Sequence, residues 1–206
     1  AVTANKDCIY RLEEIQLKEE NAGGFSLLKS GEGFYAYCYN YDGGNPGTKI
    51  DFYSLDADGG IGEKHTLSFG ENASPNIFRS DKQGNLYVIE NVYATEPDEN
   101  GVYTDKYYLL KMTVQGEELF RICLNDLKEL EGLVSDGYFY AGDMLLSDTS
   151  IYLNIAGKYA EFDVDGNFVK IINAEGLDGA QLLLLENGKI AAVTYEDNGV
   201  YASYAD

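Results

Sequence analysis

The chain has no tryptophan, a single histidine and three cysteines among its 206 residues. His65 alone cannot form a histidine zinc cluster, and a catalytic triad or Cys-His pair would have to use this one residue. The wide spacing of Cys8, Cys38 and Cys123 excludes a dense disulfide framework and any Cys-x-x-Cys motif, so we interpret each thiol as a small buried apolar group. The sequence therefore predicts no metal centre and no cofactor.

Basic residues are also scarce, because 15 Lys and Arg stand against 35 Asp and Glu, giving a formal net charge of −20. This surface would repel a phosphate backbone or an anionic bilayer, so we expect neither nucleic acid nor a membrane surface as a partner. The longest aliphatic run, residues 182–185, is far shorter than the roughly 20 apolar residues of a membrane-spanning helix. Residues 1–7 contain neither an initiator Met nor an apolar signal segment, and we expect a processed or trimmed chain.

The sequence is rich in tyrosine and glycine, and one pattern occurs four times along it. An apolar strand ends in a polar turn and leads into a second strand rich in β-branched and aromatic residues, which suit a pleated sheet. The four second strands are residues 34–37, 86–89, 151–154 and 190–193. In three repeats a third strand follows and closes on Gly59, Gly116 or Gly166, where a tight hairpin needs a positive φ. Each repeat therefore predicts a four-stranded antiparallel meander.

A single meander cannot bury both of its faces, whereas twisted meanders stacked around an axis cover one another. We therefore predict an all-β fold, a β-propeller of about four blades within one domain, residues 1–206. The blades are expected at about residues 18–70, 71–125, 134–175 and 176–206, with a short helical turn at 125–133. Two packed sheets are the alternative, although a sandwich has no reason to repeat strand, turn and glycine in the same order.

The number of blades in the complete ring stays open, because the fourth repeat ends early in its third strand. Residues 9–17 alternate apolar and charged side chains, as a half-buried edge strand does, and would close a ring of four blades. Alternatively the chain belongs to a larger ring of about six to eight blades, which we favour because its beginning looks cut. Such an open fragment would carry unpaired strand edges and would associate with its missing part or with a protein partner.

Two acidic turns invite a calcium interpretation, because carboxylates at alternate positions before a glycine open an EF-hand-like loop. Asp56 and Asp58 precede Gly59, and Asp163 and Asp165 precede Gly166. No bidentate Glu follows at the required distance, and the equivalent turn at residues 113–116 lacks carboxylates. We therefore predict hairpin turns here, and a metal site at these four aspartates is the less favoured alternative.

No catalytic constellation is apparent. His65 falls on the predicted outer strand of the first repeat, away from any axis, and adjacent carboxylates such as Glu117 and Glu118 point to opposite faces of a strand. The tyrosines allow two interpretations. Those at alternating strand positions, such as Tyr35 and Tyr37, are expected to pack one blade against the next, whereas exposed rings would suit sugars or a protein partner.

The repeats at residues 27–37, 76–91 and 161–172 resemble a known family. These tyrosine-rich, acidic, tryptophan-free blades, with strands such as residues 84–88 followed by 108–111, look like the extracytoplasmic propeller regions of lipoproteins from gut Firmicutes. In that family the propeller often precedes an extracellular solute-binding domain of an ABC importer. The chain departs from the family in lacking a lipobox, because the residues before Cys8 are too polar for one.

This resemblance implies an extracellular location at a bacterial cell surface and a non-enzymatic accessory module linked to nutrient uptake. Its partner would be a protein, a missing part of the same polypeptide or a carbohydrate, and no binding residues can be carried over from the family. A glycan-active propeller enzyme, a glycosidase or lyase, is the alternative that rests on analogy of fold.

Overall fold

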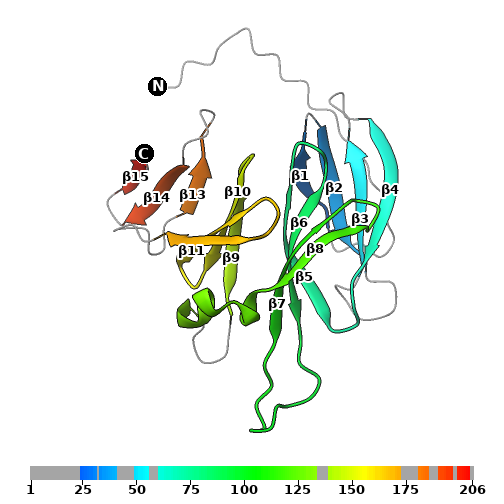
Figure 1. Ribbon diagram of the computed structural model, residues 1–206. Helices are drawn as coiled ribbons and strands as arrows, with labels where there is room; N and C mark the ends of the chain where they lie inside the picture. Colours follow the sequence, from blue (N-terminus) through cyan, green and yellow to red (C-terminus); the bar gives the residue numbers. More distant parts are fainter. Residues whose placement is uncertain are drawn as a thin grey trace.

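The structure is a computed structural model that describes residues 24–31, 33–40, 49–55, 60–133, 139–172, 181–185, 190–196 and 199–204. The described strands form four separate antiparallel sheets, each built from consecutive strands (Figure 1). We name these sheets blades 1 to 4 in chain order. The predicted all-β fold of four-stranded antiparallel blades is thereby confirmed for blades 1 to 3, and blade 4 has three described strands. The predicted strand at residues 9–17 lies outside the described residues.

The strands of each blade follow one another without crossovers. Blade 1 contains β1 (Ser26–Ser30), β2 (Gly33–Tyr39), β3 (Lys49–Leu55) and β4 (Ile61–Ser68). Blade 2 contains β5 (Ala73–Ser80), β6 (Leu86–Val92), β7 (Lys106–Met112) and β8 (Glu118–Cys123). Blade 3 contains β9 (Ala141–Leu146), β10 (Ser150–Ile155), β11 (Lys158–Asp163) and β12 (Phe168–Ile172), and blade 4 contains β13 (Gln181–Leu184), β14 (Ile190–Glu196) and β15 (Gly199–Tyr204).

The first strands of successive blades lie side by side: β1 against β5, β5 against β9 and β9 against β13. Contacts advance in the same direction along neighbouring strands, since Arg79 pairs with Asp143 and, further along, Lys82 pairs with Asp148. These inner strands therefore run parallel to one another, while β4, β8 and β12 lie at the outside of their blades. This radial order is the arrangement expected of a propeller, and a two-layer sandwich would not produce it.

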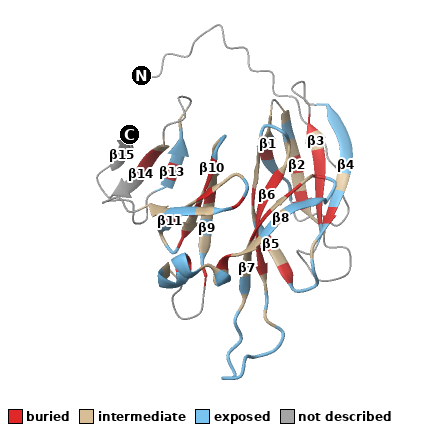
Figure 2. Ribbon diagram, in the orientation of Figure 1, coloured by how far each residue is buried: buried red, intermediate tan, exposed pale blue. Residues whose placement is uncertain are grey.

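The hydrophobic core lies between the blades. In β6, alternate side chains face opposite neighbours, because Leu86 and Val88 pack toward blade 1 whereas Tyr87 and Ile89 pack toward blade 3. Figure 2 shows the buried residues concentrated in the central strands. Each blade thus buries its two faces only against its neighbours, which explains why a single repeat would not be stable alone.

The contacts between blades are partly aromatic. The ring of Phe78 on β5 lies 5.6 Å from that of Phe52 and 5.1 Å from that of Tyr37, both in blade 1. These distances are those of favourable aromatic pairs, so the predicted packing role of the alternating tyrosines is met at Tyr37.

Two short 3₁₀ helices, η1 (Leu124–Asp126) and η2 (Lys128–Leu133), connect blade 2 to blade 3 at the predicted helical turn. Leu124 and Leu130 are buried in the core between these blades, which anchors the connection. His65 lies on the outer strand β4, as predicted. Among the described residues, no helix is long and apolar enough to cross a membrane.

Candidate functional site

The two ends of the blades differ in their connections. Because the inner strands are parallel and each blade is a meander, the hairpins at residues 81–85, 113–117 and 163–167 share one end, which we name the turn end. The links between blades and the β6–β7 connection share the other, which we name the loop end. Binding residues concentrate on connections held by a rigid scaffold, so a binding site is expected at one of these ends or along the axis between them.

At the turn end, a carboxylate organises the hairpin that contains two of the candidate metal ligands. Asp163 Oδ1 accepts hydrogen bonds from the backbone N–H of Asp165 (3.0 Å) and Asn167 (2.8 Å), and Oδ2 accepts one from Asn167 Nδ2 (2.9 Å). Gly166 adopts the positive φ of +89° that the turn requires. The side-chain and backbone donors of Asn167 hold the pKa of Asp163 below its usual value.

The same arrangement occurs in blade 2, where the Asp81 carboxylate accepts from the N–H of Gln83 and Asn85 and from Asn85 Nδ2. Asp163 therefore acts as a turn residue, which was the interpretation favoured over a calcium loop. Asp56 and Asp58 lie outside the described residues. Within the part of the chain that the structure describes, no group of three or more His, Cys, Asp or Glu side chains is arranged to hold a metal ion.

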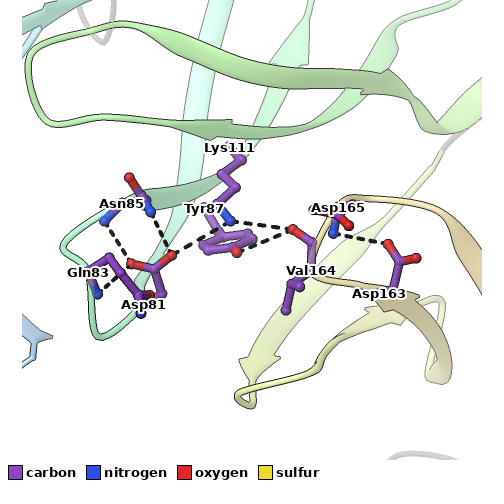
Figure 3. Close-up of polar contacts among 8 residues, drawn as sticks. All are labelled: Asp81, Gln83, Asn85, Tyr87, Lys111, Asp163, Val164 and Asp165. Atoms are coloured by element: carbon purple, nitrogen blue, oxygen red, sulfur yellow. Dashed lines mark hydrogen bonds and ion pairs between the residues drawn. The ribbon is translucent and has the colours of Figure 1, made fainter.

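A lysine joins blades 2 and 3 beside these turns (Figure 3). Lys111 Nζ lies 4.9 Å from the centre of the Tyr87 ring, 3.7 Å from Asp81 Oδ2 and 3.4 Å from the carbonyl oxygen of Val164, to which it donates. Tyr87 Oη donates to the same carbonyl at 3.5 Å. Burial raises the pKa of Tyr87, and the neighbouring ammonium opposes that rise. The cluster is a contact between blades whose donors are already used, which leaves little capacity for a ligand.

Along the axis, the inner strands bring one ion pair together. Arg79 Nη2 on β5 lies 2.5 Å from Asp143 Oδ1 on β9, and both side chains are partly exposed. Asp143 is the only carboxylate on the described inner strands β1, β5, β9 and β13. Glycosidases generally act with two carboxylates, and only one is present on these four strands.

At the loop end, residues 93–105 form a hairpin that projects beyond the sheet between β6 and β7 (Figure 1), and we name it the arm. Its tip repeats the carboxylate-organised turn, because Asp98 Oδ1 accepts from the N–H of Asn100 and Val102, both at 2.8 Å. Gly101 has a φ of +80°. These backbone donors lower the pKa of Asp98, so this carboxylate stays ionised to lower pH than usual.

The base of the arm is also held in place. Ala94 N–H donates to Asp105 Oδ1 at 3.0 Å. Asn125, from η1, accepts from the N–H of Tyr107 at 2.7 Å and donates to the carbonyl of Asp105 at 3.2 Å. Polar side chains therefore hold the arm in place at both its tip and its base.

Exposed aromatic side chains gather at this end of the molecule. Tyr103 on the arm is 62% exposed, Tyr140 before β9 is 71% exposed, and Tyr93 and Val102 are about half exposed. By contrast Tyr87 and Tyr159 are buried between blades. Both interpretations of the tyrosines therefore apply, in different places: Tyr87 and Tyr159 on strands of blades 2 and 3 are core, and Tyr93, Tyr103 and Tyr140 at the loop end are exposed to a ligand.

A buried ion pair completes the set of charged groups that the fold arranges. Glu90 on β6 is almost fully buried and pairs with Arg121 on β8, whose guanidinium lies 4.3 Å from the centre of the Tyr108 ring. Burial raises the pKa of Glu90 and the guanidinium opposes the rise. Both partners belong to blade 2, so this pair lies within one sheet and does not form an open site.

No protein-family model matches the chain, and no curated protein sequence matches it. Several solved structures resemble it, and two of them illustrate the likeness. A protein of unknown function from Bacteroides caccae is 10% identical with a TM-score of 0.47, covering 89% of this chain and 62% of that one. The GH43 protein BlXynB from Bacillus licheniformis is 12% identical with a TM-score of 0.42, covering 82% of this chain and 35% of that one. The chain thus spans less than two thirds of each protein, and a likeness at this level is no ground for assigning an activity.

Proposed function

We propose that the chain is a non-catalytic binding module at a bacterial cell surface, the accessory propeller of a lipoprotein linked to nutrient uptake. Its location and its association with uptake follow from the resemblance of its blades to extracytoplasmic propeller regions. Its ligand, a protein or a carbohydrate, would be contacted by the loop end.

The single observation that carries the binding function is the ordered arm. Tyr103 is exposed on a hairpin whose turn is organised by Asp98, so an aromatic contact surface is presented with little conformational entropy left to lose. No packing requirement of the blades explains an exposed tyrosine at this position.

A glycan-active enzyme is the second candidate, because Asp143 is partly exposed at the axis. Its carboxylate is already paired with Arg79, and the described inner strands offer no second carboxylate, whereas a glycosidase generally uses two. This arrangement suits a structural ion pair better than a general acid.

The test separates these functions. The 206-residue protein is run through native gels containing soluble neutral polysaccharides, and the same mixtures are assayed for new reducing ends. A carbohydrate ligand would give retardation without turnover, lost in Tyr103→Ala and kept in Leu119→Ala, which truncates an exposed apolar side chain of the outer strand β8. Turnover that disappears in Asp143→Asn would replace the binding function with the enzyme. A null result with polysaccharides leaves the protein partner, which is tested below, and failure of both assays would overturn the proposal.

A further inference from the structure

The arm combines apolar exposure with charge of a single sign. Residues 93–105 contain the acidic residues Glu96, Asp98, Glu99 and Asp105 and no Lys or Arg. Beside these carboxylates, Tyr103 and Val102 are exposed at the tip and Tyr93 at the base.

The carboxylates of the arm fall into two classes. Asp98 and Asp105 accept backbone N–H groups and hold the hairpin in shape. Glu96 and Glu99 are exposed, and their carboxylates take part in no hydrogen bond or ion pair with the described residues. Asp98 and Asp105 thus stabilise the hairpin, whereas the carboxylates of Glu96 and Glu99 are available to interact with a partner.

We propose that the arm docks on a protein partner that presents Lys or Arg side chains next to an apolar surface. The inference rests on the proposed binding function and names its partner. Aromatic faces attract ammonium and guanidinium groups, and carboxylates beside them strengthen that attraction and speed the encounter. A neutral glycan would gain nothing from Glu96 and Glu99, and an anionic surface would be repelled by them.

The ordering of the arm matters to this contact. Because Asp98 fixes the tip before binding, the partner does not have to order the hairpin, and Tyr103 is held in its exposed position. A single hairpin offers only a small interface, so the contact is expected to be transient and sensitive to salt.

The experiment uses the full chain and immobilised synthetic peptides. One peptide alternates Arg with Leu and Tyr, and its counterpart carries Gln in place of Arg. Binding is measured by surface plasmon resonance at about 25 mM and about 500 mM NaCl, because screening separates charge from apolar contact. We expect binding to the Arg peptide only, weakened at high salt.

Matched variants locate the contact. Glu96→Gln with Glu99→Gln should weaken binding of the Arg peptide about tenfold, and so should Tyr103→Ala, whereas Tyr103→Phe should retain it. The control pair, Glu63→Gln with Glu117→Gln, removes the same charge from exposed positions outside the arm and should change affinity less than about twofold. Circular dichroism of each variant confirms that the blades remain folded.

Several results would overturn the inference. Equal weakening by the control pair would mean that overall charge, not the arm, attracts the peptide. Binding of neutral polysaccharide that needs Tyr103 but not Glu96 and Glu99 would leave the binding function in place and refute the cationic partner. Absence of binding to either peptide, with polysaccharide bound, would have the same meaning, and absence of all binding would refute both proposals.

Discussion

Replacing Lys111 by Met tests how blades 2 and 3 are held together. The substitution keeps most of the side-chain volume and removes the ammonium, which lies 4.9 Å from the Tyr87 ring centre and 3.7 Å from Asp81 Oδ2. The side chain is only 16% exposed, so the charge is largely withdrawn from water. The substitution loses the attraction of the ammonium to Tyr87 and Asp81, but it also removes the cost of burying that charge. These two effects on the free energy of unfolding oppose each other.

The magnitude follows from the geometry. A partly desolvated cation–π contact contributes about 1 to 2 kcal/mol, and the donation to the Val164 carbonyl, at 3.4 Å, is at the weak end of hydrogen bonding. Removing the buried ammonium returns part of its desolvation cost. The carbonyl keeps Tyr87 Oη as a donor and Asp81 keeps its turn donors, so Lys111→Met should destabilise the protein by only about 1 kcal/mol.

Asp81→Ala removes the other partner of this ion pair. It removes three hydrogen bonds, from Gln83 N–H, Asn85 N–H and Asn85 Nδ2, and it removes the carboxylate that pairs with Lys111. At about 1 kcal/mol for each bond, this substitution should cost about 3 kcal/mol. The control Lys82→Met breaks an exposed ion pair with Asp148 and should cost less than about 0.5 kcal/mol.

Urea unfolding followed by circular dichroism measures all three changes, and a double-mutant cycle gives the coupling between Lys111 and Asp81. We expect a coupling below about 1 kcal/mol, because the two charged atoms are 3.7 Å apart. If Lys111→Met costs as much as Asp81→Ala, the ion pair and not the turn holds this boundary, and the reasoning is wrong.

Three further outcomes follow from single residues. Because burial raises the pKa of Glu90, the folded protein binds this proton more tightly than the unfolded chain, so the stability linked to it is greatest below the usual Glu pKa and falls as pH rises through the folded value. Glu90→Gln does not titrate, so its unfolding free energy minus that of the wild type should increase between about pH 4 and about pH 7, and a flat difference would contradict the shift. Gly166→Ala should cost about 3 kcal/mol in urea unfolding, because its φ is positive and a Cβ would collide with Ile122, whereas Gly101→Ala, with positive φ but open space, should cost about 1 kcal/mol; equal costs would show that the collision is relieved. Asp98→Ala should increase amide hydrogen exchange throughout the arm and leave the exchange of the strands unchanged, and unchanged exchange in the arm would mean that its tip does not depend on this carboxylate.

The blades could be predicted because their signals are local. Strand alternation and the turn glycines act within a few residues of one another, and at Gly116 and Gly166 the hairpins form where the repeat places them. The preference for a turn over a calcium loop at Asp163 also needed only local reasoning, since the turn at residues 113–116 forms without a carboxylate.

The candidate site could not be predicted in the same way, because it depends on which residues face a neighbouring blade. Alternation assigns Tyr87 to one face of a strand but does not say what covers that face, and it says nothing of Tyr103, which lies between strands. The pairing of Arg79 with Asp143 joins residues 64 positions apart and needs the radial order of the inner strands. The sequence carries one signal for the arm, because the Asp-x-x-Gly pattern of the blade turns occurs again at Asp98.

That pattern bears on how the acidity of the chain should be understood. Where an Asp begins an Asp-x-x-Gly turn, as Asp81, Asp98 and Asp163 do, its carboxylate is occupied by N–H donors, and the fold itself requires it. A carboxylate that accepts no N–H donor has no such requirement, and on the arm this describes Glu96 and Glu99. The acidic residues that give the chain its large negative charge therefore have more than one role. Some carboxylates shape the hairpins, and any propeller with these turns would keep them. The carboxylates of Glu96 and Glu99 have no such role, and the charged partner is inferred from them.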